Sequence, residues 1–463
     1  MSSLSRGKIW IFITAILLFI ICTCTAAGQN KIKLEEAINI GIENNNELRE
    51  TRKNILNMER NLRIQKAGRD WNLELSGGYS YMSDPVYEER SDISLSLSSF
   101  REYQGFNINP SLGISGSSTG DLINFEDSID LSINFSTVLF PRIITESEAR
   151  VKQLQDNIIL QKERYKYQEN DKIIEWISDY LSLIRSQKRV EFGQEQLKYA
   201  KDHYNTVKRQ LEIDEAGERD LINAEIEKKD ARINFRQLEE NFNQENKSFA
   251  LSLGLDENEE LIITDQAEYL NKKQDLIEKT DIFHDQKRKK ELLLENSTAL
   301  LAFENEKKWA TKDLVKLKKE TAPEITVGGN FMLPDPEWSA DISFSYSVFD
   351  GGVSDLEIEK QQDELTHIER NYEEQKQELL SDLENKMNNL YLRKEQKELS
   401  ELRLQREEMN SQHQKEKLNR GTITELEYKQ QLLQEDESHL TLEEAHDLIM
   451  ISKLEILNIT GIF

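Results

Sequence analysis

The sequence predicts a mainly α-helical protein with a small β-sheet portion, in which one helix–strand–strand–helix–helix unit occurs twice. Three observations support this prediction. Apolar residues at heptad spacing run through long charged segments, and the whole chain has only 6 prolines. Short segments alternate apolar and polar residues, which is the period of a strand with one apolar face. Finally, segments of the first half correspond to segments of the second half at fixed offsets.

Composition separates this chain from ordinary globular domains. Charged residues make up 32% of it and hydrophobic residues 37%, a balance that also occurs in disordered chains. The regular spacing of the apolar residues favours long helices over disorder. The formal net charge of −26 disfavours nucleic acid and anionic lipid as partners, because both are negatively charged.

The N-terminal segment, residues 1–28, has the pattern of a secretory signal. Arg6 and Lys8 precede the apolar run IWIFITAILLFIIC, and small residues follow it. An uncleaved membrane anchor is the alternative. Cleavage after residue 28 would take the formal charge from −26 to −28 and remove both cysteines, Cys22 and Cys24. Lipidation of Cys24 is a further alternative, although the residues before it match a lipobox poorly.

The helices are predicted from heptad stripes. One stripe places an apolar residue at every seventh position, at Trp176, Leu183, Val190, Leu197, Tyr204 and Leu211. A narrow apolar seam of this kind is typical of coiled-coil packing. The two longest helices would each span roughly 100 Å at about 1.5 Å per residue, and two shorter helices end to end would match one of them. The predicted helices cover residues 33–68, 144–211, 218–254, 286–320, 353–419 and 424–460.

Four segments alternate in the manner of membrane strands, with lengths near the 9 to 11 residues that such a strand needs. In the last of them Ile342 and Phe344 alternate with Ser343 and neighbouring serines. We expect the apolar face to meet lipid and the polar face to line a wet lumen. A soluble sandwich with the same alternation is the alternative. The predicted strands are 71–81, 128–140, 323–332 and 338–349.

The internal correspondences define the domain organisation. Residues 43–50 match 295–302 at an offset of 252, whereas Phe140 matches Phe349 at an offset of 209. The first copy therefore has 43 extra residues between its strands, within 82–128, where another alternating run occurs. We expect this insertion to form either an extracellular loop or an extended hairpin of the barrel. The predicted divisions are a first repeat (29–255), an inter-repeat segment (256–285) and a second repeat (286–463).

Four strands are too few to close a membrane barrel, because the smallest closed bacterial barrels have about eight. We therefore expect several chains to share one barrel, and three chains would supply twelve strands. Turn signals mark where each copy passes from its last strand into a long helix. These turns comprise Phe140 and Pro141 in the first copy, and Phe349, Asp350, Gly351 and Gly352 in the second.

Sequence motifs for catalysis are absent. The chain has no nucleotide-binding loop, no dinucleotide fingerprint and no zinc-hydrolase motif. Its 6 histidines are scattered along the sequence. We expect no enzymatic activity, no cofactor and no metal site.

In their order, these segments resemble the TolC-like outer membrane efflux protein family. The resemblance is carried by residues 44–81, by INFSTVLFPR and SYSVFDGG at strand ends, and by LNRGTITELEYKQQ (418–431) at a helix turn. It implies a homotrimer with a 12-stranded barrel in outer membrane lipid and a helical periplasmic tunnel, with residues 256–285 at the tunnel's equator. Such a trimer is a passive exit duct for efflux or type I secretion. The implied partners are an inner-membrane transporter and a periplasmic adaptor (membrane fusion) protein.

The resemblance also places a periplasmic entrance at the helix turns. Gly421 and Thr424 match its pattern, and Glu427 stands where the family tends to have an inward acidic residue. Asp220 corresponds to Glu427 in the first copy, and Arg420 could form an ion pair with an adaptor or a neighbouring chain. A ring of carboxylates from three chains would attract cations. A periplasmic adaptor and a structural coiled-coil rod remain the alternative functions.

Overall fold

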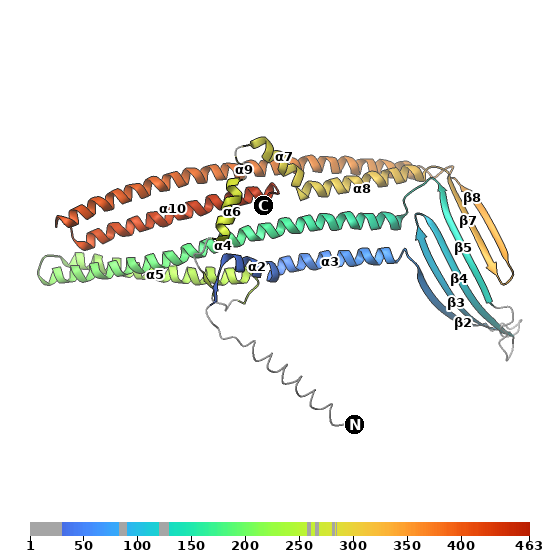
Figure 1. The fold of residues 1–463 in the computed structure, drawn as a ribbon, viewed down its shortest axis with the longest axis horizontal. Coiled ribbons are helices and arrows are strands. Elements are labelled where there is room, and N and C mark those ends of the chain that lie inside the picture. The colour runs from blue at the N-terminus through green and yellow to red at the C-terminus, as the bar shows by residue number, and fades with distance from the viewer. Residues whose placement is uncertain are drawn as a thin grey trace, which may run out of the picture. The chain divides into compact units, whose positions relative to one another are not determined.

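The computed structural model describes residues 30–82, 90–119, 129–256, 261–263, 268–279, 283 and 285–463. The signal peptide predicted at residues 1–28 lies outside the described residues. The chain divides into two compact units, each built from segments that are separate in the sequence. Figure 1 shows the helices and strands of both units. Of the described residues, the hairpin unit comprises those within 30–49, 168–289 and 383–463, and the sheet unit comprises those within 50–167 and 290–382.

Nine helices occur in the part of the chain that the structure describes. The longest, α4 and α9, have 67 residues each, and α5 and α10 have 35 each. The bounds of these four helices agree with the predicted ones to within two residues, whereas α6 lies in the inter-repeat segment, for which no helix was predicted. The helices are α2 (Leu34–Asn44), α3 (Asn46–Ala67), α4 (Glu146–Glu212), α5 (Glu218–Ser252), α6 (Glu268–Lys279), α7 (Gln286–Asn296), α8 (Thr298–Glu320), α9 (Val353–Asn419) and α10 (Glu425–Ile459).

The first and fourth predicted helices are wrong in one respect, because each is broken into two. Asn45 separates α2 from α3, and Ser297 separates α7 from α8. Both side chains accept a hydrogen bond from a backbone N–H of the following helix: Leu48 N lies 3.1 Å from Asn45 Oδ1, and Leu300 N lies 3.3 Å from Ser297 Oγ. Each break thus starts a new helix with a side-chain cap.

The core of the hairpin unit forms where α2, α4 and α5 meet. Trp176 of α4 is completely buried, and the ring of Tyr180 lies edge-on to that of Phe249, with centroids 6.2 Å apart. A Cβ atom on Gly41 would lie 2.7 Å from the Trp176 indole. Glycine at position 41 therefore lets the Trp176 indole pack directly against the backbone of α2.

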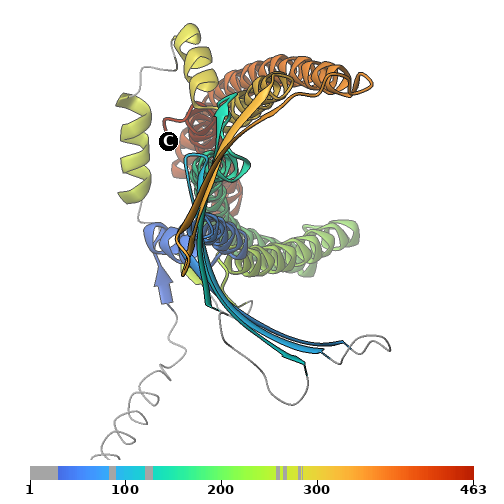
Figure 2. The same ribbon diagram turned by 90° about the vertical axis from the view of Figure 1, so that its right-hand side faces the viewer.

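The sheet unit contains a six-stranded antiparallel sheet with the order β2-β3-β4-β5-β7-β8. Its strands are long and curved (Figure 2). A separate two-stranded sheet in the hairpin unit pairs β1 (Asn30–Ile32) with β6 (Leu261–Ile263) in parallel. The strands of the large sheet are β2 (Asn72–Met82), β3 (Arg90–Tyr103), β4 (Phe106–Thr119), β5 (Ile129–Phe140), β7 (Glu324–Leu333) and β8 (Glu337–Ser345).

Two predictions about the strands are wrong. The sheet has six strands instead of four, because the insertion within 82–128 forms a hairpin, one of the two expected alternatives, whose strands β3 and β4 pair in register with their neighbours. The last strand also ends at Ser345, four residues before the predicted end at Phe349. Its partner for Ser345 is Glu324, the first residue of β7, so the ladder offers no partner for residues farther along.

Candidate functional site

The two faces of the large sheet differ in polarity, as the alternation predicts. On the polar face, hydroxyls from neighbouring strands lie within hydrogen-bond distance: the Oγ atoms of Ser76 and Ser96 are 2.6 Å apart, and those of Ser111 and Ser132 are 2.7 Å apart. On the other face, the register aligns one leucine from each of five adjacent strands in a row. This leucine row comprises Leu75, Leu97, Leu112, Leu131 and Leu333.

Aromatic residues flank the leucine row on the same face. Phe106, Phe140 and Phe344 lie on the helix side of the row, and so does Trp338, whose partner Phe331 comes two residues before Leu333; Tyr79 lies on the far side. All five flanking residues are exposed; Trp338, for example, is 78% exposed. Exposed aliphatic and aromatic side chains on one face of a sheet, with polar side chains on the other, are the pattern of strands that cross a bilayer.

Both edges of this sheet are open within the described chain. β2 pairs only with β3, and β8 pairs only with β7. Every residue of β2 and of β8 is exposed. The apolar side chains on these edges are highly exposed; Leu75, for example, is 66% exposed and Ile342 is 77% exposed. An unpaired edge beside apolar side chains is a template for another strand.

The strand-to-helix turn of the second copy is held by Asp350. Its carboxylate accepts hydrogen bonds from Gly352 N and Ser354 N, both at 2.9 Å. Hydrogen bonds from the side chain and backbone of Ser354, and from the backbone of Gly352, lower the pKa of Asp350 to about 2. Gly351 and Gly352 have φ of 72° and 83°, conformations that glycine adopts without strain. Phe349 is 88% exposed.

The corresponding turn of the first copy is built differently. It contains Phe140, which is half exposed, and Pro141, which is buried. The next helix, α4, begins at Glu146, and its preceding residue Thr145 accepts a hydrogen bond from Glu148 N at 3.3 Å. A hydroxyl cap thus replaces the Asp350 arrangement of the second copy.

The sequence did not predict the role of Glu102, which links the inserted hairpin β3–β4 to the ends of the helices. Its carboxylate accepts hydrogen bonds from the hydroxyls of Thr145 and Ser147 at the start of α4. Its backbone N–H donates to Arg69 O at 3.1 Å, and the Arg69 guanidinium lies 3.8 Å from the Glu102 carboxylate. One acidic residue in an alternating run gives no signal of such contacts, because all its partners are distant in sequence.

The predicted entrance residues Arg420, Gly421, Thr424 and Glu427 gather at the turn between α9 and α10. Thr424 is the N-cap of α10: its hydroxyl accepts a hydrogen bond from Glu427 N at 3.2 Å, while its backbone N–H donates to Glu427 Oε2 at 2.7 Å. This is a reciprocal capping box, and its hydrogen bonds from Thr424 lower the pKa of Glu427. Gly421 has a φ of 72°, and Arg420 lies 3.4 Å from Glu416.

The first copy has an equivalent turn between α4 and α5, at the same end of the hairpin unit (Figure 1). Asp220 accepts a hydrogen bond from Gly217 N at 3.0 Å, which corresponds to one half of the capping box of α10, since the N-cap Gly217 has no side chain to complete it. Asp214 occupies the position that Gly421 has in the second copy, and it has a φ of 54°. The structure therefore gives Asp220 and Glu427 a local role in helix capping.

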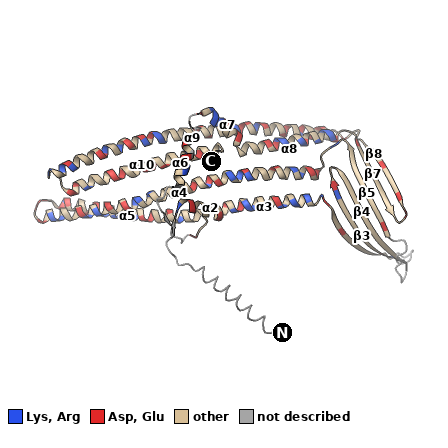
Figure 3. Cartoon of the chain, in the orientation of Figure 1, with Lys and Arg blue, Asp and Glu red and all other residues tan. Residues whose placement is uncertain are grey.

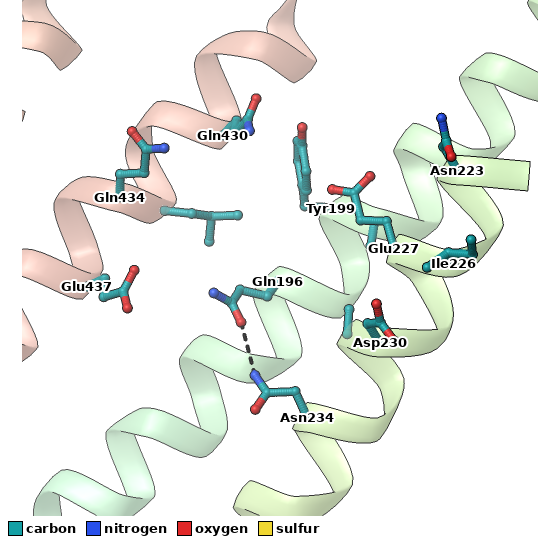
Figure 4. Close-up of a pocket in the computed structure, with 13 residues that line it drawn as sticks. Gln196, Tyr199, Asn223, Ile226, Glu227, Asp230, Asn234, Gln430, Gln434 and Glu437 are labelled. Atoms are coloured by element: carbon teal, nitrogen blue, oxygen red, sulfur yellow. Dashed lines mark hydrogen bonds between the residues drawn. The ribbon is translucent and has the colours of Figure 1, made fainter. Parts of the chain in front are cut away.

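A cavity of about 600 Å³ lies between α4, α5 and α10 in the hairpin unit (Figure 4). Amides and carboxylates dominate its lining, including Gln196, Glu227 and Gln434. Glu227 Oε2 is 2.7 Å from His203 Nδ1. Burial, together with the charges of Glu227 and Glu427, raises the pKa of Tyr199 in the wall. The cavity is thus a polar, acidic recess near the helix turns.

Charge is distributed unevenly along the elements. Acidic and basic residues cover the helices, whereas the strands carry few of either (Figure 3). Within the part of the chain that the structure describes, no helix is both long enough and apolar enough to cross a bilayer. The charged helix surfaces suit an aqueous environment, and the apolar face of the sheet does not.

No protein-family model and no curated protein matches the sequence. Solved structures, in contrast, match nearly its whole length. CusC matches with a TM-score of 0.63 and 13% identity over 92% of this chain and 91% of CusC. The outer membrane protein VceC from Vibrio cholerae matches with a TM-score of 0.63 and 11% identity, covering 92% and 96% of the two chains.

The open state of the Neisseria gonorrhoeae MtrE outer membrane channel matches equally well, with a TM-score of 0.63 and 13% identity over 92% of this chain and 88% of MtrE. These likenesses show that the chain has the fold of the TolC-like outer membrane channels, as the sequence resemblance predicts.

Proposed function

We propose that this chain is one subunit of a trimeric outer membrane channel, with a large periplasmic portion. In this proposal the channel is the exit duct of a tripartite efflux or type I secretion system. It conducts substrates passively from an inner-membrane transporter and a periplasmic adaptor to the exterior. The structural likeness to outer membrane channels supports this assignment.

One observation carries the proposal: a sheet with an exposed apolar face and two open edges. In lipid, every backbone N–H and C=O needs a partner, so an open sheet edge is not tolerated there. The sheet has an even number of strands, six in antiparallel order, so β8 of one copy runs antiparallel to β2 of the next. Identical copies can therefore close a ring without changing the pairing pattern, and lipid then covers the leucine row and the exposed aromatic residues on the same face.

The helices support the periplasmic part of the proposal. Acidic and basic residues occur along their whole length (Figure 3), and ion pairs join the two helical hairpins. Lys188 of α4 lies 2.8 Å from Glu443 of α10, and Arg189 lies 2.7 Å from Glu444. We infer that these contacts hold the hairpins side by side in a tunnel wall. The entrance is then at the turns that carry Glu427 and Asp220.

Fractionation and electrophysiology test this function. The full chain, expressed with its signal segment in a Gram-negative host, should be recovered from the outer membrane as a trimer that heat dissociates. Purified trimers should conduct ions across a planar bilayer without a nucleotide or a proton gradient. Recovery as a soluble periplasmic monomer would contradict the proposal and favour an adaptor or a coiled-coil rod.

A further inference from the structure

We propose that the inserted hairpin β3–β4 is part of the barrel wall, so that three copies of this chain close eighteen strands instead of twelve. This inference rests on the proposed function and concerns the width of the exit. Each chain contributes six strands, and the diameter of a barrel grows roughly linearly with its strand number. The barrel would be about 1.5 times as wide as one built from four strands per chain.

The pairing of the hairpin supports this inference first. β3 pairs with β2 along the whole length of β2, from Asn72↔Phe100 to Met82↔Arg90. β4 pairs with β5 over nine consecutive positions, from Phe106↔Thr137 to Ile114↔Ile129. The hairpin therefore separates β2 from β5 at every level of the sheet. A loop projecting beyond the sheet would leave these two strands paired with each other.

The polarity of the hairpin supports the inference independently. Leu97 and Leu112 continue the leucine row between Leu75 and Leu131. On the opposite face, Ser96 lies beside Ser76 and Ser111 beside Ser132. Both faces of the hairpin thus match the apolar and polar faces of the adjoining strands at the same level. A segment surrounded by water would not need this apolar face.

The turn of the hairpin lies at the helix end of the sheet. It is formed by Gln104 and Gly105, with φ of 51° and 79°. The adjacent Glu102 is bound to Thr145 and Ser147 of the α4 start and to Arg69 O. The hairpin consequently extends from the far rim of the sheet to its junction with the helices, which is the full height of the wall.

The second copy shows the arrangement without an insertion. There β7 and β8 pair directly, and only Pro334, Asp335 and Pro336 connect them. The sequence correspondences place Met82 opposite Pro334 and Asp127 opposite Pro336. Replacing residues 82–127 of the first copy with Pro-Asp-Pro would therefore give a chimera with four strands in each chain.

A wider barrel changes where the duct selects its cargo. Its cross-section would be about 2.3 times that of the four-strand form, since area follows the square of diameter. The acidic helix turns would then be the narrow part of the duct, and the exit would admit bulkier solutes than a twelve-stranded barrel does.

Electron microscopy of purified trimers, viewed along the barrel axis, tests the inference. The full chain should show a barrel about 1.5 times as wide as that of the 82–127→Pro-Asp-Pro chimera. Equal diameters in the two trimers would overturn the eighteen-stranded wall while leaving the channel function intact. Absence of a trimer in the full chain would overturn the channel function as well.

Accessibility labelling tests the inference on the full-length chain if the chimera fails to fold. Leu97→Cys should react with a membrane-confined maleimide, and Ser96→Cys with a charged, water-soluble one. Leu75→Cys and Ser76→Cys on β2 are the matched controls. Reaction of Leu97→Cys with the water-soluble reagent alone, when Leu75→Cys reacts from lipid, would overturn the proposal.

Discussion

Glu427 illustrates how one residue can serve both a fold and a function. The sequence resemblance assigns it to a pore entrance, and the structure shows it in a capping box with Thr424. Replacing Glu427 with alanine would remove both the charge and the cap, so its result would be ambiguous. Glutamine keeps the geometry of a capping box while removing the charge.

We expect Glu427→Gln to reduce the preference of the channel for cations, because three carboxylates leave the entrance. The measurement is the reversal potential across a planar bilayer under a salt gradient. Glu425→Gln is the matched control, since Glu425 is exposed in the same first turn of α10 and lies outside the capping box. Unchanged selectivity in Glu427→Gln would remove this residue from the entrance.

A substitution at Gly41 tests the packing of α2 against α4 in the hairpin unit. An added methyl group would collide with the buried Trp176 ring, and overpacking of this kind costs typically about 1–3 kcal/mol. We expect Gly41→Ala to accelerate hydrogen exchange in α2. Gly68→Ala is the control, because its nearest neighbour would be 3.5 Å away. Equal protection of α2 in the two variants would contradict the packing.

Asp350 makes the second strand-to-helix turn sensitive to acid. Its pKa falls from 3.8 to about 2 in the folded chain, so its stabilisation is complete above pH 4 and is lost as the pH falls through about 2. We expect the amides of Gly352 and Ser354 to lose protection in that window, as measured by hydrogen exchange. Asp350→Asn should lack this transition, and a transition that persists in the variant would identify another group.

At the scale of elements, the α9–α10 turn and the α4–α5 turn have different residues at the position where the backbone φ is positive. Gly421 and Asp214 both have positive φ, and a side chain there costs roughly 1–2 kcal/mol. We expect Gly421→Ala to weaken its turn and Asp214→Gly to strengthen the other. Hydrogen exchange of residues 418–424 and 211–217 measures both effects. Changes of the same sign in the two variants would contradict this explanation.

Most helices could be predicted from the sequence because heptad spacing fixes the buried face of a long helix. The stripe through α4 is buried at Trp176, Leu183 and Leu197. The breaks at Asn45 and Ser297 could not be predicted in this way, because the apolar spacing continues across them. A break depends on contacts such as that of Asn45 Nδ2 with Ser252 O at 2.9 Å, which local patterns do not contain.

The strands were predictable in kind but not in number. Alternation identified the polar and apolar faces, including the run around Ile108 and Leu112. Whether that run projects as a loop or joins the sheet depends on pairing with β2 and β5, and pairing is set by distant segments. For the same reason the anchoring role of Glu102 became visible only in the structure.

At the scale of the whole molecule, closure of a barrel requires the two open edges of the sheet to pair with neighbouring copies. The natural chain has cysteines only at positions 22 and 24, so a cleaved chain carrying engineered cysteines would have no others. The decisive variants combine Ser76→Cys on β2 with a cysteine at Ser339, Asp341 or Ser343 on β8. Ser115→Cys replaces the β2 cysteine in the control, because β4 is an interior strand.

Disulfide crosslinking of these variants in outer membranes is the most direct test of the central claim. We predict that at least one β2–β8 pair gives covalent dimers and trimers on a denaturing gel, whereas every pair with Ser115→Cys stays monomeric. Monomers in all β2–β8 pairs, in chains that are folded and membrane-embedded, would contradict closure of the barrel by neighbouring copies.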